Sequence, residues 1–167
     1  MLAVFAAVFT AFFAAAAYLA IERGDYKKYE KEVTLAAEKF GVEKSLIFAV
    51  IRTESNFNEK AKSKKGALGI MQIMPSTAVF VADMLDFSGY DLFNASDNIV
   101  LGVKYLAYLS GKFKFEGAVL AAYNAGEANA KKWLDDSGEK FFNGVPFNET
   151  RRYIKKVQRR KGLYGYA

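Results

Sequence analysis

The first 21 residues of the chain carry no charged side chain, and this constrains the fold more than any other feature. At a rise of 1.5 Å per residue, a helix of this length spans about 30 Å, the thickness of one bilayer hydrocarbon core. We therefore expect a membrane-spanning anchor over residues 1–21. A cleaved signal peptide with its small residues at 14–17 and a buried core helix are the alternatives. The signal peptide is less favoured because the apolar stretch is long and no basic segment precedes it.

The charges beside this segment do not fix which side of the membrane the rest of the chain would occupy. Arg23, Lys27, Lys28 and Lys31 follow the segment, and the positive-inside rule alone would place them in the cytoplasm. Long downstream domains, however, are often translocated regardless of the flanking charge. The orientation therefore has to be inferred from function.

The sequence pattern of residues 22–167 predicts one all-α domain, because apolar side chains recur at helical spacing and no strand-like alternation of useful length occurs. About 140 residues are enough to bury a hydrophobic core. Helices are expected over 26–40, 43–54, 76–85, 98–110, 116–123, 127–134 and from 148 to about 160, with a polar loop at 56–73. We expect Gly41 to end the first helix, and Asp97 and Asn148 to cap two of the later ones.

The composition removes several classes of active site, because the chain contains no Cys and no His. Disulfides, thiolate metal sites, Ser-His-Asp triads and His-Glu-x-x-His zinc sites are therefore excluded. We expect neither a metal nor a cofactor. Proton transfer near neutral pH would have to be carried out by a carboxyl group, a Tyr or a Lys.

Glu54 is the carboxylate whose position is least ordinary. It follows Ile47, Val50 and Ile51 by seven, four and three residues, which places it on the apolar face of its helix. It also lies in the last turn, where the helix dipole disfavours an anion. Both effects raise the pKa of a carboxyl group, and a protonated carboxyl can act as general acid at a glycosidic bond. The alternative is an ordinary Glu at a frayed helix end, with its carboxylate in water.

Several motifs surround and follow this residue. The first stretch holds Ile-Arg-Thr-Glu-Ser-Asn-Phe-Asn at 51–58, Ala-Lys-Ser at 61–63, Gly-Ala at 66–67, and Gly-Ile-Met-Gln-Ile-Met-Pro-Ser-Thr-Ala at 69–78. Ala-Ala-Tyr-Asn-Ala-Gly follows at 121–126, and Val-Pro-Phe-Asn-Glu-Thr-Arg-Arg-Tyr-Ile at 145–154. In this order and spacing, the motifs make the sequence resemble the lysozyme-like lytic transglycosylase family, of the soluble lytic transglycosylase type. Ile70, where the family usually has Leu, and Arg152, where Asn is common, are mild departures.

The resemblance implies a lysozyme-like helical fold, with Glu54 as the single catalytic acid and Ser55 as a residue that supports the site. It further implies that the sugar groove is lined, or the acid positioned, by Ser63, Gln72, Met74, Tyr123, Asn124, Glu149 and Tyr153. In this family a Tyr hydroxyl contacts the catalytic carboxyl, which makes Tyr123 and Tyr153 the candidates. Purely structural interpretations are also open, with residues 123–126 as a helix C-cap and Met71 and Met74 as core filling.

The resemblance also implies a lyase rather than a hydrolase. Hydrolysis of a glycosidic bond usually needs a second carboxylate, and between Glu54 and Gln72 the sequence offers only Glu59. The related goose-type lysozymes tend to carry Asp at the position of Met74. The expected reaction is cleavage of the β-1,4 bond between N-acetylmuramic acid and N-acetylglucosamine with formation of 1,6-anhydromuramic ends. A lysozyme-type hydrolase and a membrane-tethered, lectin-like peptidoglycan-binding module are the alternatives.

The expected reaction also predicts where the protein is located and what it binds. Peptidoglycan lies outside the cytoplasmic membrane, so we expect an envelope protein anchored through residues 1–21, with the domain 22–167 outside. Secretion after signal cleavage is the alternative. The partners would be glycan strands and the membrane, and the protein would be a monomer. We expect no nucleic-acid partner, although residues 151–167 carry seven basic residues and no acid. Such a segment is expected to be the solvated face of a docked helix.

Overall fold

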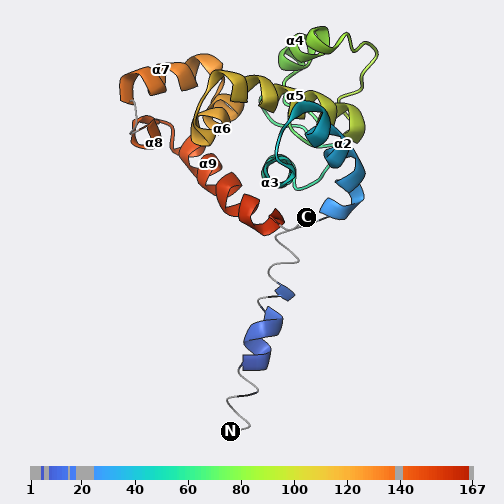
Figure 1. Ribbon diagram of the computed structural model, residues 1–167, viewed down its shortest axis with the longest axis vertical. Helices are drawn as coiled ribbons and strands as arrows, with labels where there is room; N and C mark the ends of the chain where they lie inside the picture. Colours follow the sequence, from blue (N-terminus) through green and yellow to red (C-terminus); the bar gives the residue numbers. More distant parts are fainter. Residues whose placement is uncertain (1–4, 6–7, 15, 18–24, 138–140, 166–167) are drawn as a thin grey trace.

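The computed structural model describes residues 5, 8–14, 16–17, 25–137 and 141–165. Within these residues the chain is helical, and the only β-type pairing consists of isolated bridges that join Lys62 to Leu68 and Leu68 to Ile73. The predicted all-α fold is therefore confirmed. Short loops connect most of the helices, and one long loop links α3 to α4 (Figure 1).

The helices follow one another along the chain as drawn in Figure 1. In order they are η1 (Tyr26–Tyr29), α2 (Glu30–Phe40), α3 (Lys44–Glu54), α4 (Pro75–Leu85), α5 (Ala95–Lys112), α6 (Glu116–Ala125), α7 (Glu127–Ser137), α8 (Phe141–Gly144), α9 (Asn148–Lys161) and η3 (Gly162–Tyr164). The expected caps were partly wrong. Asn94, not Asp97, caps α5, because its side chain accepts a hydrogen bond from the backbone N–H of Asp97 at 3.2 Å. Asn148 is already the first residue of α9, and Phe147 precedes it at the cap.

Helix α3 lies at the centre of the hydrophobic core. Its continuous apolar run, residues 47–51, is completely buried, as a helix covered on all sides requires. It packs against α2, α9 and η3. Tyr164 of η3 closes one end of this core, with its ring centroid 5.4 Å from that of Phe48 and 5.7 Å from that of Tyr26. The surroundings of α3 are therefore built from both ends of the chain.

The basic C-terminal segment forms α9, which docks by its apolar side. Tyr153, Ile154 and Val157 are buried against the domain, whereas Arg152 and Lys155 are exposed. The expectation of a docked helix with a solvated basic face is confirmed.

The predicted anchor falls largely outside the described residues. Of the range 1–21, residues 5, 8–14 and 16–17 are described, and they are helical with exposed side chains. No helix among the described residues is long and apolar enough to cross a membrane. The membrane-spanning segment and the boundary at residue 21 therefore stay predictions.

Candidate active site

Glu54 is the last residue of α3, and its position follows from how that helix ends. The chain leaves the helix at Ser55, and the next two residues, Asn56 and Phe57, have φ angles of 56° and 64°. Two successive non-glycine residues in the left-handed region turn the backbone sharply away from the helix axis. The Glu54 carboxyl is therefore held at the end of a buried helix, facing a pocket rather than another turn of helix.

The environment of Glu54 favours its protonated form. Burial raises the pKa of this carboxyl from 4.5 to about 7, while the Tyr153 hydroxyl and the charge of Lys156 act in the opposite direction. The direction agrees with the expectation from the sequence, because removing a carboxylate from water penalises the ionised form. Near neutral pH the group can both release and accept a proton.

Tyr153 of α9 is the tyrosine whose hydroxyl changes the pKa of Glu54. Its hydroxyl lies close enough to Glu54 to lower the pKa of that carboxyl, and burial together with the Glu54 charge raises the pKa of Tyr153. The hydroxyl nevertheless lies outside ordinary hydrogen-bond geometry with every acceptor among the described residues. A buried hydroxyl without a hydrogen-bond partner destabilises the folded state by about 1–3 kcal/mol. The Tyr153 hydroxyl is therefore a donor that can serve the ionised Glu54 carboxylate or a bound ligand.

Tyr123 of α6 takes a different role from Tyr153. Its hydroxyl donates a hydrogen bond to the backbone carbonyl of Met71 at 2.9 Å. The charge of Glu54 raises the pKa of Tyr123, which shows that the two groups lie within electrostatic reach. Of the two candidates for contact with the acid, Tyr153 has the hydroxyl that lowers the pKa of Glu54, whereas the Tyr123 hydroxyl is committed to the backbone.

Ser55 connects the end of α3 to the loop that faces it. Its hydroxyl donates to the carbonyl of Ile70 at 2.6 Å and lies 3.3 Å from the carbonyl of Ile51. The first contact bridges two segments of the site that are 15 residues apart. This geometry agrees with the supporting role expected for Ser55.

Gln72 holds a strained turn in the same loop. Its φ angle is 53°, and its side-chain amide donates to the carbonyls of Gly69 at 2.9 Å and Ala61 at 3.1 Å. Gly69 has a φ angle of 77°, and a Cβ there would lie 2.1 Å from the carbonyl oxygen of Leu92. The turn therefore requires glycine at position 69, three residues before Gln72, because any larger residue would clash there.

The sequence analysis missed Asn98, which fixes this loop from α5. Its fully buried side chain accepts from the N–H of Met71 at 2.8 Å and donates to the carbonyls of Leu68 at 3.0 Å and Leu92 at 2.9 Å. An amide side chain that satisfies three backbone groups supplies hydrogen bonds in a loop whose own backbone pairing is limited to isolated bridges. The signal in the sequence was a polar residue at an apolar position of a predicted helix.

Two pockets meet at Gln72, which lines both. The acid pocket, with a volume of about 630 Å³, contains Glu54, Ser55 and Ser63. The tyrosine pocket, with a volume of about 460 Å³, is lined by residues that include Met74, Thr77, Tyr105, Tyr123, Asn124, Asn129, Phe147, Glu149 and Thr150. All the predicted lining residues except Tyr153 therefore line one pocket or the other. Gln72 is the residue that the two pockets share.

The remaining predicted residues have individual contacts. Ser63 accepts a hydrogen bond from the N–H of Ala67 at 2.9 Å, and Asn124 accepts one from the Thr150 hydroxyl at 3.0 Å. The interpretation as core filling is confirmed for Met71, which is completely buried, and wrong for Met74, which is 39% exposed. Glu149 is exposed and lies 3.9 Å from Lys65 at the edge of the tyrosine pocket. Residues 123–126 also end a helix, since α6 stops at Ala125 and Gly126 follows it at a φ angle of 93°.

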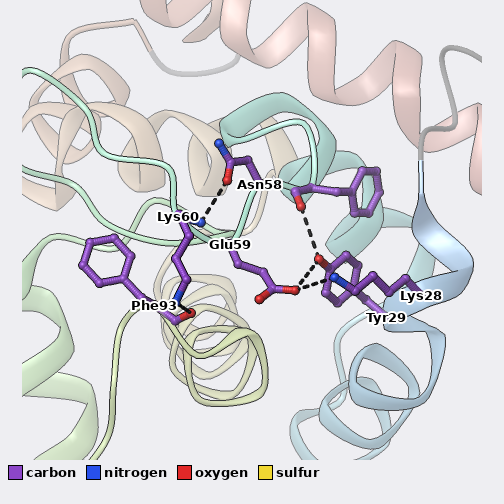
Figure 2. A network of polar contacts seen from close by, with 7 residues as sticks. Lys28, Tyr29, Asn58, Glu59, Lys60 and Phe93 are labelled. Carbon is purple, nitrogen blue, oxygen red and sulfur yellow. Dashed lines mark hydrogen bonds and ion pairs between the residues drawn. The ribbon is translucent and has the colours of Figure 1, made fainter.

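Figure 2 shows a second network, on the loop that follows Glu54. The Tyr29 hydroxyl donates to Glu59 at 2.7 Å, and the Lys28 ammonium lies 2.8 Å from the same carboxylate oxygen. The Tyr29 ring stacks on Phe57 with a centroid distance of 6.0 Å and an interplanar angle of 7°. We call this group of residues, Lys28, Tyr29, Phe57 and Glu59, the N-terminal clamp. It joins η1 to the strained segment beside the acid.

Acidic side chains do not gather elsewhere in a metal-binding arrangement. Among the residues that the structure describes, no group of three or more His, Cys, Asp or Glu side chains could hold a metal ion.

Known proteins share both the sequence and the fold of this domain. The sequence profile of the transglycosylase SLT domain matches residues 31–144. This chain belongs to that family. The crystal structure of the 70-kDa soluble lytic transglycosylase from Escherichia coli superimposes with a TM-score of 0.77 at 34% identity, covering 83% of this chain and 24% of that one. The predicted lysozyme-like family is confirmed.

Other members of the SLT family are similar over most of this chain. The soluble lytic murein transglycosylase of Escherichia coli K12 is 37% identical over 135 residues, which are 75% of this chain and 21% of the relative. The membrane-bound lytic murein transglycosylase C of Edwardsiella ictaluri is 34% identical over 166 residues, 82% of this chain and 46% of that relative. The chain thus spans from about a fifth to about half of the length of these relatives.

An inactive variant of a further SLT protein is known by its structure. It is the lytic transglycosylase Slt of Pseudomonas aeruginosa with a glutamate replaced by glutamine, and it superimposes with a TM-score of 0.76 at 32% identity over 82% of this chain and 24% of its own. In the present chain, η1 with Tyr29 precedes the SLT match and α9 with Tyr153 follows it. Both flanking helices contribute contacts around Glu54.

Proposed function

We propose that this chain is a peptidoglycan lytic transglycosylase that cleaves the β-1,4 bond between N-acetylmuramic acid and N-acetylglucosamine and leaves 1,6-anhydromuramic ends. One observation carries the proposal: a single, partly buried carboxyl with a pKa of about 7, Glu54, stands in a groove lined by amides and tyrosines. Membership of the SLT family and the names of its relatives support the same reaction.

The first step is protonation of the leaving group. Glu54 in its acid form donates its proton to the glycosidic oxygen, and the bond from that oxygen to the muramic C1 breaks. The substrate's own acetamido group stabilises the positive charge that develops at C1. A pKa of about 7 places the acid form within reach at neutral pH, where an ordinary Glu would be ionised.

The second step returns the proton to the enzyme. The Glu54 carboxylate takes the proton of the muramic O6 hydroxyl, and that oxygen forms the new bond to C1. The 1,6-anhydro ring results, and Glu54 is again protonated for the next turnover. The Tyr153 hydroxyl, which has no hydrogen-bond partner among the described residues, would donate to the carboxylate while it is ionised.

The absence of a second carboxylate beside Glu54 supports a lyase over a hydrolase. Among the described residues that line the acid pocket, Glu54 is the only acid. Glu59 is occupied by the N-terminal clamp, and Glu149 stands exposed at the edge of the other pocket. Inverting hydrolysis would require a second carboxylate that activates a water molecule at C1, and neither Glu59 nor Glu149 lines the acid pocket.

Product analysis tests the proposal directly. The full chain in detergent is incubated with purified sacculi, and the fragments are identified by mass spectrometry. We expect 1,6-anhydromuramic ends from the wild type and none from Glu54→Gln. Reducing ends in their place would identify a lysozyme-type hydrolase, and equal binding by both proteins without any cleavage would identify a lectin-like module.

We also propose that residues 1–21 anchor the protein in the cytoplasmic membrane and hold the domain 22–167 on its outer side, in the cell envelope. The location of the proposed substrate supports this arrangement, as does the similarity to relatives named membrane-bound. A periplasm-dependent reporter fused after Ala167 should be active, and activity of a cytoplasm-dependent reporter alone would contradict the orientation. The predicted monomeric state can be checked by sedimentation of the same protein.

A further inference from the structure

Three cationic side chains form a stripe along the solvent-facing side of α9. Arg152, Lys155 and Arg159 are exposed, and their spacing of three and four residues places them on one face of the helix. At a rise of 1.5 Å per residue, the stripe is about 10 Å long. We call these three residues the α9 stripe. The sequence contains no acidic residue from position 151 to its last residue, so no carboxylate of this helix lies among them.

Other basic residues of α9 point elsewhere. The Lys161 ammonium lies 2.7 Å from Glu43 and 2.7 Å from Glu116. The Arg160 guanidinium is buried against the end of α3, and Lys156 lines the acid pocket. The α9 stripe is thus the basic part of the helix that faces away from both the core and the acid pocket.

The C-terminal end of α9 lies beside the start of the domain. Tyr164, which follows α9 in η3, packs edge to face on Tyr26, the first residue of η1, with the ring centroids 5.7 Å apart. Figure 1 shows α9 running along one edge of the domain to this point. Tyr26 follows the proposed anchor, residues 1–21, by five positions, and five residues of chain span at most about 18 Å. An anchored chain therefore holds this end of α9 close to the bilayer surface.

We propose that the α9 stripe docks on anionic phospholipid headgroups of the leaflet from which the domain emerges. The inference rests on the proposed anchor, because that segment brings the stripe to the bilayer. Guanidinium and ammonium groups bind phosphate oxygens, and each basic residue close to an anionic membrane strengthens binding by about fivefold. Docking also sets the acid pocket at a fixed distance from the membrane, since Lys156 and Arg160 of the same helix line that pocket.

A fluorescent label on α9 tests this docking in the full-length chain. The sequence contains no Cys, so Gln158→Cys, at an exposed position beside Arg159, gives a single labelling site. The labelled protein is reconstituted into phosphatidylcholine vesicles with or without phosphatidylglycerol, and quenching by a spin label on the lipid headgroups is measured. We expect quenching at position 158 to be at least about twofold stronger with phosphatidylglycerol, and this gain to disappear at high salt. A label at Ser76→Cys on α4, which Figure 1 shows on the far side of the domain, should be quenched weakly in both vesicles.

Charge variants identify the surface that docks. The stripe variant carries Arg152→Gln, Lys155→Gln and Arg159→Gln, and on anionic vesicles its label at position 158 should be quenched no more than on neutral ones. The control variant removes the same number of charges at exposed positions outside α9 and should keep the stronger quenching. Its substitutions are Lys39→Gln, Lys114→Gln and Lys132→Gln.

Several outcomes would overturn the docking. It is refuted by equal quenching of the wild type on neutral and anionic vesicles, or by an equal loss in the control variant. A stripe variant that keeps its quenching on anionic vesicles but binds sacculi less well would assign the stripe to wall polymers instead of lipid. Failure of the wild type to float with either vesicle would refute the anchor and the docking together. In each case, anhydro ends released from sacculi by the wild type would leave the proposed reaction intact.

Discussion

Burial of the Glu54 side chain opposes the ionisation of its carboxyl group. The side chain sits where a carboxylate is poorly solvated, and the cost appears as a pKa raised to about 7. A pKa that is higher in the folded state than in the unfolded chain means that the acid form stabilises the fold. This contribution is complete below about pH 4.5 and is lost as the pH rises through about 7.

Glu54→Gln should therefore stabilise the protein at alkaline pH. The neutral amide removes the penalty of a partly buried carboxylate, so the free energy of unfolding should rise by about 1–3 kcal/mol near pH 8. The difference from wild type should vanish below about pH 4.5, where both side chains are neutral. Urea denaturation of both proteins at several pH values measures it, and a difference that does not depend on pH would contradict the raised pKa.

Tyr153→Phe isolates the action of one hydroxyl on the acid. Because this hydroxyl lowers the pKa of Glu54, its removal should move the basic limb of the pH profile of kcat/KM to higher pH, and kcat should fall because the carboxylate loses a donor. The free energy of unfolding should rise by about 1–3 kcal/mol, since the substitution removes a buried hydroxyl that has no partner among the described residues. A basic limb that stays in place would show that the hydroxyl does not act on Glu54.

At the scale of elements, the loop after Glu54 is shaped by contacts with helices on either side. The N-terminal clamp fixes residues 57–59 against η1, Asn98 of α5 fixes residues 68–71, and Ser55 joins the two parts. The loop holds left-handed residues at 56, 57 and 72, which cost free energy and persist only when surrounding contacts impose them. Its conformation is thus a property of the packed elements.

The clamp can be tested through its carboxylate. Hydrogen bonds from Lys28 and Tyr29 lower the pKa of Glu59, so its ionised form stabilises the fold at neutral pH and this contribution disappears as the pH falls through that lowered value. Glu59→Gln should lower the free energy of unfolding by roughly 0.5–1 kcal/mol at neutral pH and have little effect in acid. Glu38→Gln, at an exposed position of α2, is the control. Equal effects of the two substitutions would argue against a specific clamp.

For the whole molecule, the decisive contact joins the C-terminal helix α9 to the end of α3. Arg160 of α9 is buried, and its guanidinium donates to the carbonyl of Arg52 at 2.9 Å and lies 3.4 Å from the Thr53 hydroxyl. It thereby satisfies a carbonyl in the last turn of α3, two residues before the acid. Helix α9 also supplies Tyr153. Its docking completes the site through the contact of Arg160 with Arg52, which lie 108 positions apart in the chain.

Arg160→Met should weaken this docking. The substitution leaves the Arg52 carbonyl without its donor and removes a buried cation, so we expect a loss of about 2–4 kcal/mol in the free energy of unfolding. Arg159→Met, on the exposed side of the same helix, should change it by less than about 0.5 kcal/mol. Guanidinium denaturation gives both values, and similar losses for the two variants would rule out a special role of Arg160.

The sequence by itself determined most of the helices, the apolar run of α3 and the position of Glu54 at its end, because helical periodicity is a local property of the chain. The roles that the ordered motifs imply for the groove residues stay predictions. Helix ends were less certain, as Asn94 rather than Asp97 caps α5, since both residue types suit a cap and the register of the helix decides between them.

Only the tertiary structure decided which partners these residues meet. It brought the Tyr153 hydroxyl within electrostatic reach of Glu54, directed the Tyr123 hydroxyl to the Met71 carbonyl, gave Asn98 three backbone partners and joined Tyr29 to Glu59. Each of these contacts depends on how helices far apart in the sequence pack together. Packing fixes distances and angles that no local pattern of residues contains.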